Sequence, residues 1–250
     1  MPTTIGSFRS RGIFITGTDT GVGKTIVSAA IALSLRKTGK RVAVLKPVTS
    51  GALTIDGKRV SEDAELLRWA SACSAPDTDI APYLLLEPLA PSESAAREGV
   101  VIEVNKVGKA FERLSASHDF VIVEGAGGLL VPLAQDLLVV DLAAELSLPL
   151  VIVARPNLGT INHTLMTCEC ALSRGIEVLG VVINGQPEHP DVAEEYAGRV
   201  IAEYAAVPVV AVLPRCTDAT EKLVVERLSE VPEMEDLITL LSQEFLHEKS

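Results

Sequence analysis

The stretch Gly17-Thr18-Asp19-Thr20-Gly21-Val22-Gly23-Lys24-Thr25 is the part of this chain that decides the expected fold. An apolar run at residues 13–15 predicts a strand before it, and residues 26–35 predict a helix after it. A glycine-bearing turn between strand and helix, closed by Lys-Thr, is typical of a loop that wraps phosphate groups with its backbone N–H groups. The N-terminus of the following helix adds a partial positive charge. We therefore predict a phosphate-binding site here, and we call residues 17–25 the phosphate loop.

The phosphate loop departs from the strict GxxxxGK[ST] pattern at one position. That pattern requires glycine at residue 18, where this chain has Thr18, and Gly17 stands one residue earlier. A glycine-rich turn without a ligand is the alternative interpretation, and the flanking strand and helix make it the weaker one. In the favoured interpretation Lys24 supplies charge to the phosphates and the Thr25 hydroxyl binds magnesium.

Composition narrows the class of protein. The chain has 250 residues, of which 48% are apolar, so a sizeable core can form. Its net charge of -11 argues against a nucleic-acid partner and against binding to anionic membranes, and favours a solvated acidic surface. The four cysteines form no C-x-x-C pair, which favours free thiols in a reducing compartment. With no apolar run long enough for a signal peptide or a membrane span, we expect a cytoplasmic protein.

Predicted strands and helices alternate along the chain, which indicates a doubly wound, mostly parallel α/β sheet with helices on both faces. We expect one domain over residues 1–250, with a loose leader at 1–11 and a C-terminal helix within 230–250. Residues 76–98 are expected to be loop with short pieces of structure, and the segment after residue 214 a polar loop. The strands are predicted at residues 13–16, 42–45, 120–123, 150–154, 178–183 and 209–213. The helices are predicted at residues 26–35, 62–70, 103–115, 159–173, 191–204 and 234–246.

Chemically distinctive residues follow several of these strands directly. Lys46, Glu124, Asn184 and Pro214 each come just after a predicted strand, as does the phosphate loop. Ligands of doubly wound sheets collect outside the carboxyl ends of the strands. We therefore expect these residues to face one crevice.

Asp63 stands out in the helix predicted at 62–70, for which Ser61 is the expected N-cap. Leu66, Leu67 and Ala70 follow it at +3, +4 and +7, so the carboxylate falls on the apolar stripe. An acid that merely complements the helix dipole is the alternative. Because burial of an unpaired charge is costly, we favour a ligand role for Asp63 with a cation as its partner.

Six segments together resemble the dethiobiotin synthetase family, within the P-loop NTPase superfamily. They are GTDTGVGKT at 17–25, KPVTSG at 46–51, SEDAELL at 61–67, VEGAGG at 123–128, NLGTINHTL at 157–165 and the pair Ile183-Asn184. The resemblance covers roughly residues 12–225, and the order of the segments makes it specific.

The resemblance implies an ATP- and magnesium-dependent cyclo-ligase of biotin synthesis that acts as a homodimer. Such enzymes insert carbon dioxide between the two amines of 7,8-diaminopelargonate to form the ureido ring of dethiobiotin. The reaction passes through a carbamate and a carbamic-phosphoric anhydride, and it consumes ATP.

The resemblance also implies a set of site residues. The catalytic residues would be Lys46 and Lys24, and the magnesium ligands Thr25, Asp63 and Glu124. Substrate would contact Ser50, Leu158, Gly159, Thr160 and Asn162, the last four in a turn that receives the substrate carboxylate across a dimer interface. The nucleotide would contact Thr20, Gly21, Val22, Gly23, Lys24, Thr25, Ile26, Asp63, Glu124, Gly125, Ala126, Gly127, Asn184, Gly185, Pro214, Arg215, Cys216 and Glu221.

Three residues depart from the family pattern. Gly21 stands where some relatives have glutamate, Ser92 where many have histidine, and Gly185 where an acid follows the adenine-reading asparagine. These departures leave the nucleotide preference open. The residues expected to bind phosphate and metal all match the family pattern.

Two other functions fit the sequence less well. A switch ATPase of the partitioning or septum-positioning type would carry an extra lysine early in the phosphate loop, where this chain has Thr18 and Asp19. Such proteins also tend to end in a basic amphipathic helix, whereas residues 234–250 are acidic or neutral. A corrinoid-ring amidating synthetase would need an added glutaminase domain, for which the chain leaves no room.

Overall fold

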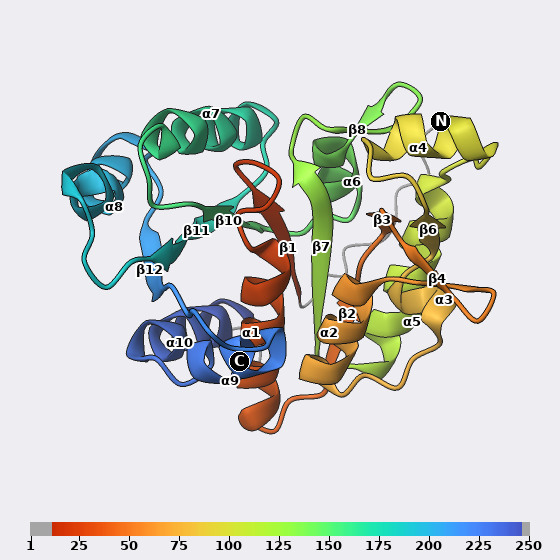
Figure 1. Ribbon diagram of the computed structural model, residues 1–250, viewed down its shortest axis with the longest axis horizontal. Helices are drawn as coiled ribbons and strands as arrows, with labels where there is room; N and C mark the ends of the chain where they lie inside the picture. Colours follow the sequence, from red (N-terminus) through yellow and green to blue (C-terminus); the bar gives the residue numbers. More distant parts are fainter. Residues whose placement is uncertain (1–11, 247–250) are drawn as a thin grey trace.

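A six-stranded parallel sheet runs through the protein in the order β12-β11-β10-β1-β7-β2 (Figure 1). The computed structural model describes residues 12–246. The parallel sheet confirms the fold class predicted from the sequence, a doubly wound α/β sheet. The six strands are β1 (Gly12–Gly17), β2 (Val42–Leu45), β7 (Phe120–Gly128), β10 (Leu150–Ala154), β11 (Val178–Gln186) and β12 (Val209–Pro214).

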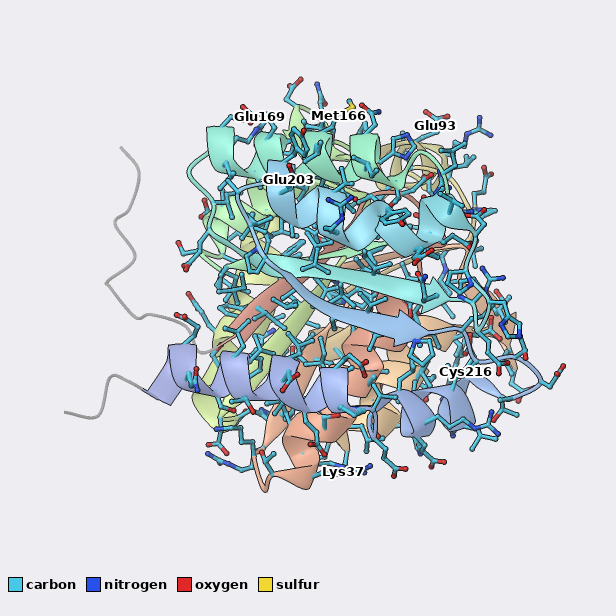
Figure 2. All side chains as sticks on the ribbon, turned by 90° about the vertical axis from the view of Figure 1, so that its left-hand side faces the viewer. Lys37, Glu93, Met166, Glu169, Glu203 and Cys216 are labelled. Carbon is cyan, nitrogen blue, oxygen red and sulfur yellow. The ribbon has the colours of Figure 1, made fainter. Side chains whose placement is uncertain are left out.

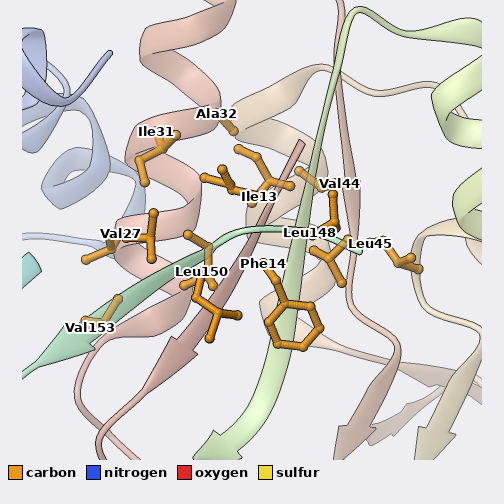
Figure 3. Close-up of a cluster of buried hydrophobic side chains, with 14 of the residues drawn as sticks. Ile13, Phe14, Val27, Ile31, Ala32, Val44, Leu45, Leu148, Leu150 and Val153 are labelled. Atoms are coloured by element: carbon orange, nitrogen blue, oxygen red, sulfur yellow. The ribbon is translucent and has the colours of Figure 1, made fainter. Parts of the chain in front are cut away.

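The central strands carry long apolar runs because helices cover both of their faces. In β1 the side chains of Ile13, Phe14 and Ile15 are completely buried. Figure 3 shows Ile13 and Phe14 packed with residues of α1 (Lys24–Lys37) and of the neighbouring strands. Burial of one such side chain stabilises a fold by about 1.5–3 kcal/mol, so this core holds the start of the phosphate loop firmly.

The helices form two layers. Helices α1, α2, α9 and α10 pack on one another and cover one face of the central sheet. Helices α5, α6, α7 and α8 contact its strands from the other face. Figure 1 shows α7 and α8 on the opposite side of β10–β12 from α9 and α10. The remaining helices of these layers are α2 (Glu62–Ser71), α5 (Val104–Ser117), α6 (Val139–Glu145), α7 (Thr160–Ser173), α8 (Val192–Tyr204), α9 (Glu221–Leu228) and α10 (Pro232–Leu246).

Each predicted strand and helix is present, with ends that differ by a few residues. Ser61 caps α2 as expected, since its side chain accepts a hydrogen bond from the N–H of Ala64 at 3.1 Å. The expectation of a polar loop after residue 214 is wrong in part, because α9 forms there behind the cap of Thr220. The loose leader predicted at 1–11 lies outside the described residues, as do the last four residues of the segment 230–250.

The connections between the main elements carry short pieces of structure. The segment 76–98 holds α3 (Asp77–Ile80), β6 (Tyr83–Leu85) and α4 (Pro91–Glu98), and β6 pairs in parallel with β3 (Val48–Ser50). Two small hairpins complete the fold, β4 (Leu53–Ile55) with β5 (Lys58–Val60) and β8 (Pro132–Ala134) with β9 (Leu137–Leu138).

The order of the strands defines where a ligand crevice is expected. From β1 the chain first moves to β2 at one edge, and later returns through β10 to β12 at the other edge. The connections therefore run in opposite directions on the two sides of β1, and a ligand crevice is expected at such a point. The phosphate loop directly follows β1. Within residues 12–246, no helix combines the length and the apolar character that crossing a membrane requires.

Candidate active site at the carboxyl edge of the sheet

The phosphate loop is held in a conformation that depends on glycine. Gly21 has φ 75° and Gly23 has φ 88°, both in the left-handed region that residues with a Cβ rarely adopt. Gly23 is the N-cap of α1 and contributes no side chain, so no capping side chain pairs with the first N–H groups of the helix. Such a helix start is suited to an anion.

Lys24 lies buried within the loop, with 7% of its surface exposed. Its Nζ donates a hydrogen bond to the main-chain oxygen of Asp19 at 3.2 Å. Burial, opposed by the charge of Glu124, lowers the pKa of Lys24 from its ordinary value. The lysine therefore sits at the centre of the loop, where an entering anion would favour its charged form.

Four residues from separate segments meet beside Lys24. The hydroxyl of Thr25 donates a hydrogen bond to Oε1 of Glu124 at 2.8 Å. The Nζ of Lys46 lies 2.9 Å from Oδ2 of Asp63, and it also donates to Oε1 of Glu124. We call Thr25, Lys46, Asp63 and Glu124 the lysine–carboxylate cluster.

The pairing of the strands explains why this cluster forms. Leu45 at the end of β2 pairs with Val123 of β7, so the next residues, Lys46 and Glu124, come side by side. Glu124 also pairs with Ile15 of β1, two residues before the phosphate loop. The first turn of α2 brings Asp63 to the same edge.

Burial and charge act against each other on Lys46 and Asp63. Burial alone would lower the pKa of Lys46, but Glu124 and Asp63 outweigh it and raise the pKa above its ordinary value. Burial would raise the pKa of Asp63, but the charge of Lys46 and hydrogen bonds from Lys46 and Thr25 lower it. Both groups are therefore charged near neutral pH.

The surroundings of Asp63 differ from the expected ones in one respect. The side chain is 44% exposed rather than buried on the apolar stripe, although it is less exposed than its neighbours Glu62 and Glu65. The first turn of a helix lies at the rim of the crevice, which leaves one side of the carboxylate open. Its partner is a cation, as expected, but that cation is Lys46 of the same chain.

The glycines after Glu124 let β7 pass close to the phosphate loop. A Cβ on Gly125 would lie 2.8 Å from the ring of Phe14, and Gly127 has φ 64°. A Cβ on Gly127 would come within 3.7 Å of the Thr20 hydroxyl. Gly127 therefore lies close to the loop.

The end of β11 also contacts the phosphate loop. The side-chain amide of Asn184 donates a hydrogen bond to the main-chain oxygen of Val22 at 3.0 Å. The N–H of Arg215 donates to the main-chain oxygen of Gln186 at 2.7 Å, which places the segment 214–216 beside the end of β11. Gly185 has φ 85° and open space around it.

No hydrogen bond or ion pair among residues 12–246 joins the predicted substrate residues to the lysine–carboxylate cluster. Ser50 ends β3 with a buried hydroxyl that has no hydrogen-bond partner in the described chain. The turn at residues 158–162 follows β10, the strand beside β1, and Leu158 in it is 85% exposed. Thr160, the first residue of α7, has a buried hydroxyl that likewise finds no partner among the described residues.

Glu221 is the predicted nucleotide residue that lies apart. It lines a cavity of about 540 Å³ between α2 and the start of α9, together with residues that include Trp69 and Lys222. No residue of the phosphate loop or of the six-stranded sheet lines that cavity. The contacts therefore do not join Glu221 to the lysine–carboxylate cluster.

The sequence prediction missed Arg155. This residue directly follows β10, and its Nη1 lies 3.5 Å from Oδ2 of Asp19 in the phosphate loop. The N–H of Thr18 also donates to the main-chain oxygen of Val153 at 3.0 Å, so β10 and the loop are joined twice. The sequence does hold a signal for Arg155, because this residue directly follows a predicted strand, as Lys46 and Asn184 do.

Comparisons with known proteins give the family. A family model described as an AAA domain matches residues 11–223. The ATP-dependent dethiobiotin synthetase BioD of Bacillus licheniformis is 41% identical over 210 residues, covering 84% of this chain and 88% of that protein. That of Bacillus subtilis (strain 168) is 39% identical, covering 88% and 94%, and that of Thermodesulfovibrio yellowstonii 38%, covering 92% and 99%. The chain belongs to the ATP-dependent dethiobiotin synthetase family.

Solved structures similar to this one come from relatives with other names. MinD of Pyrococcus horikoshii, solved with Mg-ADP, is 18% identical with a TM-score of 0.55, covering 93% of this chain and 96% of that one. The apo McdA of Cyanothece is 16% identical with a TM-score of 0.60, covering 94% and 98%. At such low identity these likenesses show the P-loop NTPase fold alone. Membership of the dethiobiotin synthetase family makes the switch ATPase the weaker alternative.

Proposed function

We propose that this protein forms dethiobiotin from 7,8-diaminopelargonate, carbon dioxide and ATP. The observation that carries the proposal is the convergence of Lys24, Thr25, Lys46, Asp63 and Glu124 at one edge of the sheet, in a chain of the dethiobiotin synthetase family. Such a cluster of lysines and oxygen donors beside a phosphate loop suits phosphoryl transfer, in which the protein mainly positions groups and neutralises charge.

Three oxygen donors of the cluster fit a magnesium ion. Thr25, Asp63 and Glu124 supply a hydroxyl and two carboxylates, the hard ligands that this ion prefers, and phosphates and water would complete its shell. The Oε2 atom of Glu124 is buried and has no hydrogen-bond partner in the described chain, so it remains available to a cation. When bound, magnesium would neutralise phosphate charge.

The lysines would act at two places along the reaction. Lys24, inside the phosphate loop, would hold the β- and γ-phosphates, and Lys46 would reach from the end of β2 to the carbamate and the γ-phosphate. One amine of the substrate adds carbon dioxide and loses a proton to give the carbamate, whose oxygen attacks the γ-phosphorus and releases ADP. The second amine then attacks the carbonyl carbon of the anhydride, and inorganic phosphate leaves as the ring closes. Positioning of these groups lowers the barrier because each step becomes intramolecular.

We infer that the base of ATP lies against the ends of β11 and β12. Asn184, already hydrogen-bonded to the phosphate loop, would read adenine, with Gly185 and the segment 214–216 closing the pocket. Glu221, at the start of α9, would contact the nucleotide only if α9 moves toward the ends of β11 and β12 when ATP binds.

We infer further that the active form is a homodimer in which the turn 158–162 receives the substrate carboxylate. The turn leads into the N-terminus of α7, which suits an anion. Leu158 is 85% exposed and Met166, one helical turn after Asn162, is 62% exposed. Figure 2 shows Met166 on the outer surface of α7. Two such apolar side chains near a predicted ligand turn support a subunit contact there.

Other partners and the compartment follow from the same chemistry. We expect no nucleic-acid or membrane partner for a chain of net charge -11. We expect a cytoplasmic enzyme, since ATP is its substrate and all four cysteines are free thiols.

The proposal is tested with purified protein, 7,8-diaminopelargonate, bicarbonate, magnesium and ATP. We expect dethiobiotin by mass spectrometry, in amounts equal to the ADP released. Incubation without diaminopelargonate serves as control and should release little ADP. ADP release that does not depend on diaminopelargonate, with no dethiobiotin, would instead support a nucleotide switch.

A further inference from the structure

The Lys46 ammonium occupies the space between the two carboxylates proposed as metal ligands. Its Nζ lies 2.9 Å from Oδ2 of Asp63 and also contacts Oε1 of Glu124. Lys46 is 5% exposed and Glu124 is completely buried. The lysine therefore takes the position of a cation between two acids, in a place that water screens poorly.

The same two carboxylates would have to serve a metal ion, and of the two carboxylate oxygens of Glu124 only Oε2 is without a partner in the described chain. Oε1 of Glu124 accepts hydrogen bonds from both Thr25 and Lys46, and Oδ2 of Asp63 contacts Lys46. A magnesium ion binds carboxylate oxygens at about 2.0–2.1 Å, closer than any hydrogen-bonded nitrogen. Lys46 and a metal ion could not both lie between these two carboxylates without strong repulsion between their charges.

The charges near the cluster already balance. Two acids, Asp63 and Glu124, stand here with two bases, since Lys46 contacts both carboxylates and Lys24 lies in the adjoining phosphate loop. A divalent ion entering alone would leave the site with an excess of positive charge. A triphosphate brings enough negative charge to compensate both the ion and the lysines.

We propose that this site binds a divalent cation only together with the phosphates of the nucleotide, because Lys46 holds the cation position until then. The proposal rests on the proposed function, which assigns the metal to Asp63 and Glu124. On arrival of the metal–nucleotide complex, Lys46 leaves the carboxylates and becomes free to turn toward the γ-phosphate and the carbamate. Lys46 would thus exclude a metal ion that arrives without nucleotide, and the same side chain would contact the reacting groups once the nucleotide is bound.

The test is the binding of Mn²⁺ alone, without nucleotide or substrate, followed by electron paramagnetic resonance of the free ion. We expect the wild-type protein to bind Mn²⁺ weakly, and Lys46→Met to bind it at least about tenfold more tightly. Lys46→Arg retains the charge and should bind as weakly as wild type. Lys24→Met is the matched control, since it removes one nearby positive charge without vacating the carboxylates, and it should change the affinity much less.

Two results would overturn the proposal: Lys46→Met binding Mn²⁺ no more tightly than wild type, or Lys24→Met gaining as much affinity. If Lys46→Met does not fold, the wild-type protein still gives an answer through the ¹⁵N ammonium resonance of Lys46. That resonance should stay in place on addition of Mg²⁺ alone and shift on addition of Mg²⁺ with ADP. An equal shift with Mg²⁺ alone contradicts the proposal.

The outcomes separate this proposal from the proposed function. If wild type forms dethiobiotin but Lys46→Met gains no affinity for Mn²⁺, only the role of Lys46 as a stand-in cation is wrong. If the metal results hold but no dethiobiotin forms, the site binds a metal–nucleotide complex for another reaction.

Discussion

The side-chain amide of Asn184, at the end of β11, donates a hydrogen bond across 3.0 Å to the main-chain oxygen of Val22 in the phosphate loop. This bond joins the loop to a strand two positions away in the sheet, since β10 lies between β1 and β11. One residue that is proposed to read the base thus also holds the loop that would bind the phosphates. Changes at Asn184 should therefore affect the whole nucleotide.

Asn184→Ala should weaken the binding of ADP by about tenfold, because loss of the bond to Val22 and of a contact to the base together remove roughly 1–2 kcal/mol. Isothermal titration calorimetry measures this directly. Gln186→Ala is the matched control on the same strand, since its amide donates to the main-chain oxygen of Glu194 at 3.3 Å and not to the loop. Equal losses in the two variants would mean that only the general stability of β11 matters.

The two lysines should differ in what they support. Lys46→Ala should lower kcat by at least about 100-fold, as removal of one charge-stabilising donor does in other enzymes, while the Kd for ATP stays within a few-fold of wild type. Lys24→Ala should raise the Kd for ATP and lower kcat together, because Lys24 lies inside the phosphate loop. Single-turnover kinetics and equilibrium binding separate the two effects. Near-native turnover in Lys46→Ala would remove it from the mechanism.

The ion pair of Arg41 and Asp119 predicts a pH dependence of stability. Arg41 donates to both oxygens of Asp119, with its Nη2 2.6 Å from Oδ1, and these bonds lower the pKa of Asp119 to about 2. A carboxylate whose pKa is depressed on folding stabilises the fold above its unfolded pKa of about 3.9, and this contribution is lost as the pH falls to about 2. Both side chains are partly exposed, so the contribution is at most about 1 kcal/mol.

Asp119→Asn should therefore lower the free energy of unfolding at pH 6 and make no difference near pH 2. Urea unfolding at both pH values measures it, with Glu145→Gln, an exposed acid on α6, as control. A loss in Asp119→Asn that is equally large at both pH values would show that the carboxylate charge is not the cause.

Individual residues show which parts of the fold and the site could be predicted from the sequence. Apolar runs and glycines predict β1, α1 and the phosphate loop because local pattern alone decides these elements. The sequence also placed Lys46 and Glu124 at one edge, since each follows a strand, whereas Asp63 joined them only through the resemblance to the dethiobiotin synthetase family. It could not show that Lys46 is the cation between the acids, because this depends on the pairing of β2 with β7 and on how α2 packs. Helix α9 was missed because its few apolar residues give a short signal, and packing on α1 stabilises it.

Gly23→Ala should damage nucleotide binding more than Gly21→Ala does, although both residues have a positive φ. A Cβ at position 21 meets no atom within 4 Å, so this variant bears only the cost of the left-handed backbone, about 1–2 kcal/mol. A Cβ at position 23 would lie 2.1 Å from Nδ2 of Asn184 and force that amide away from Val22. The extra loss, of roughly 1 kcal/mol, is that of one hydrogen bond.

A double-mutant cycle measures this coupling. The free energies of unfolding and the ADP affinities of Gly23→Ala, Asn184→Ala and the double variant are compared, with Gly21→Ala in place of Gly23→Ala as the control cycle. We expect Gly23→Ala to cost less once Asn184 is already alanine, because no amide then remains to be displaced. Gly21→Ala should cost the same in both backgrounds, since position 21 has open space around it. Strict additivity for Gly23 and Asn184 would show that the backbone conformation alone demands glycine at residue 23.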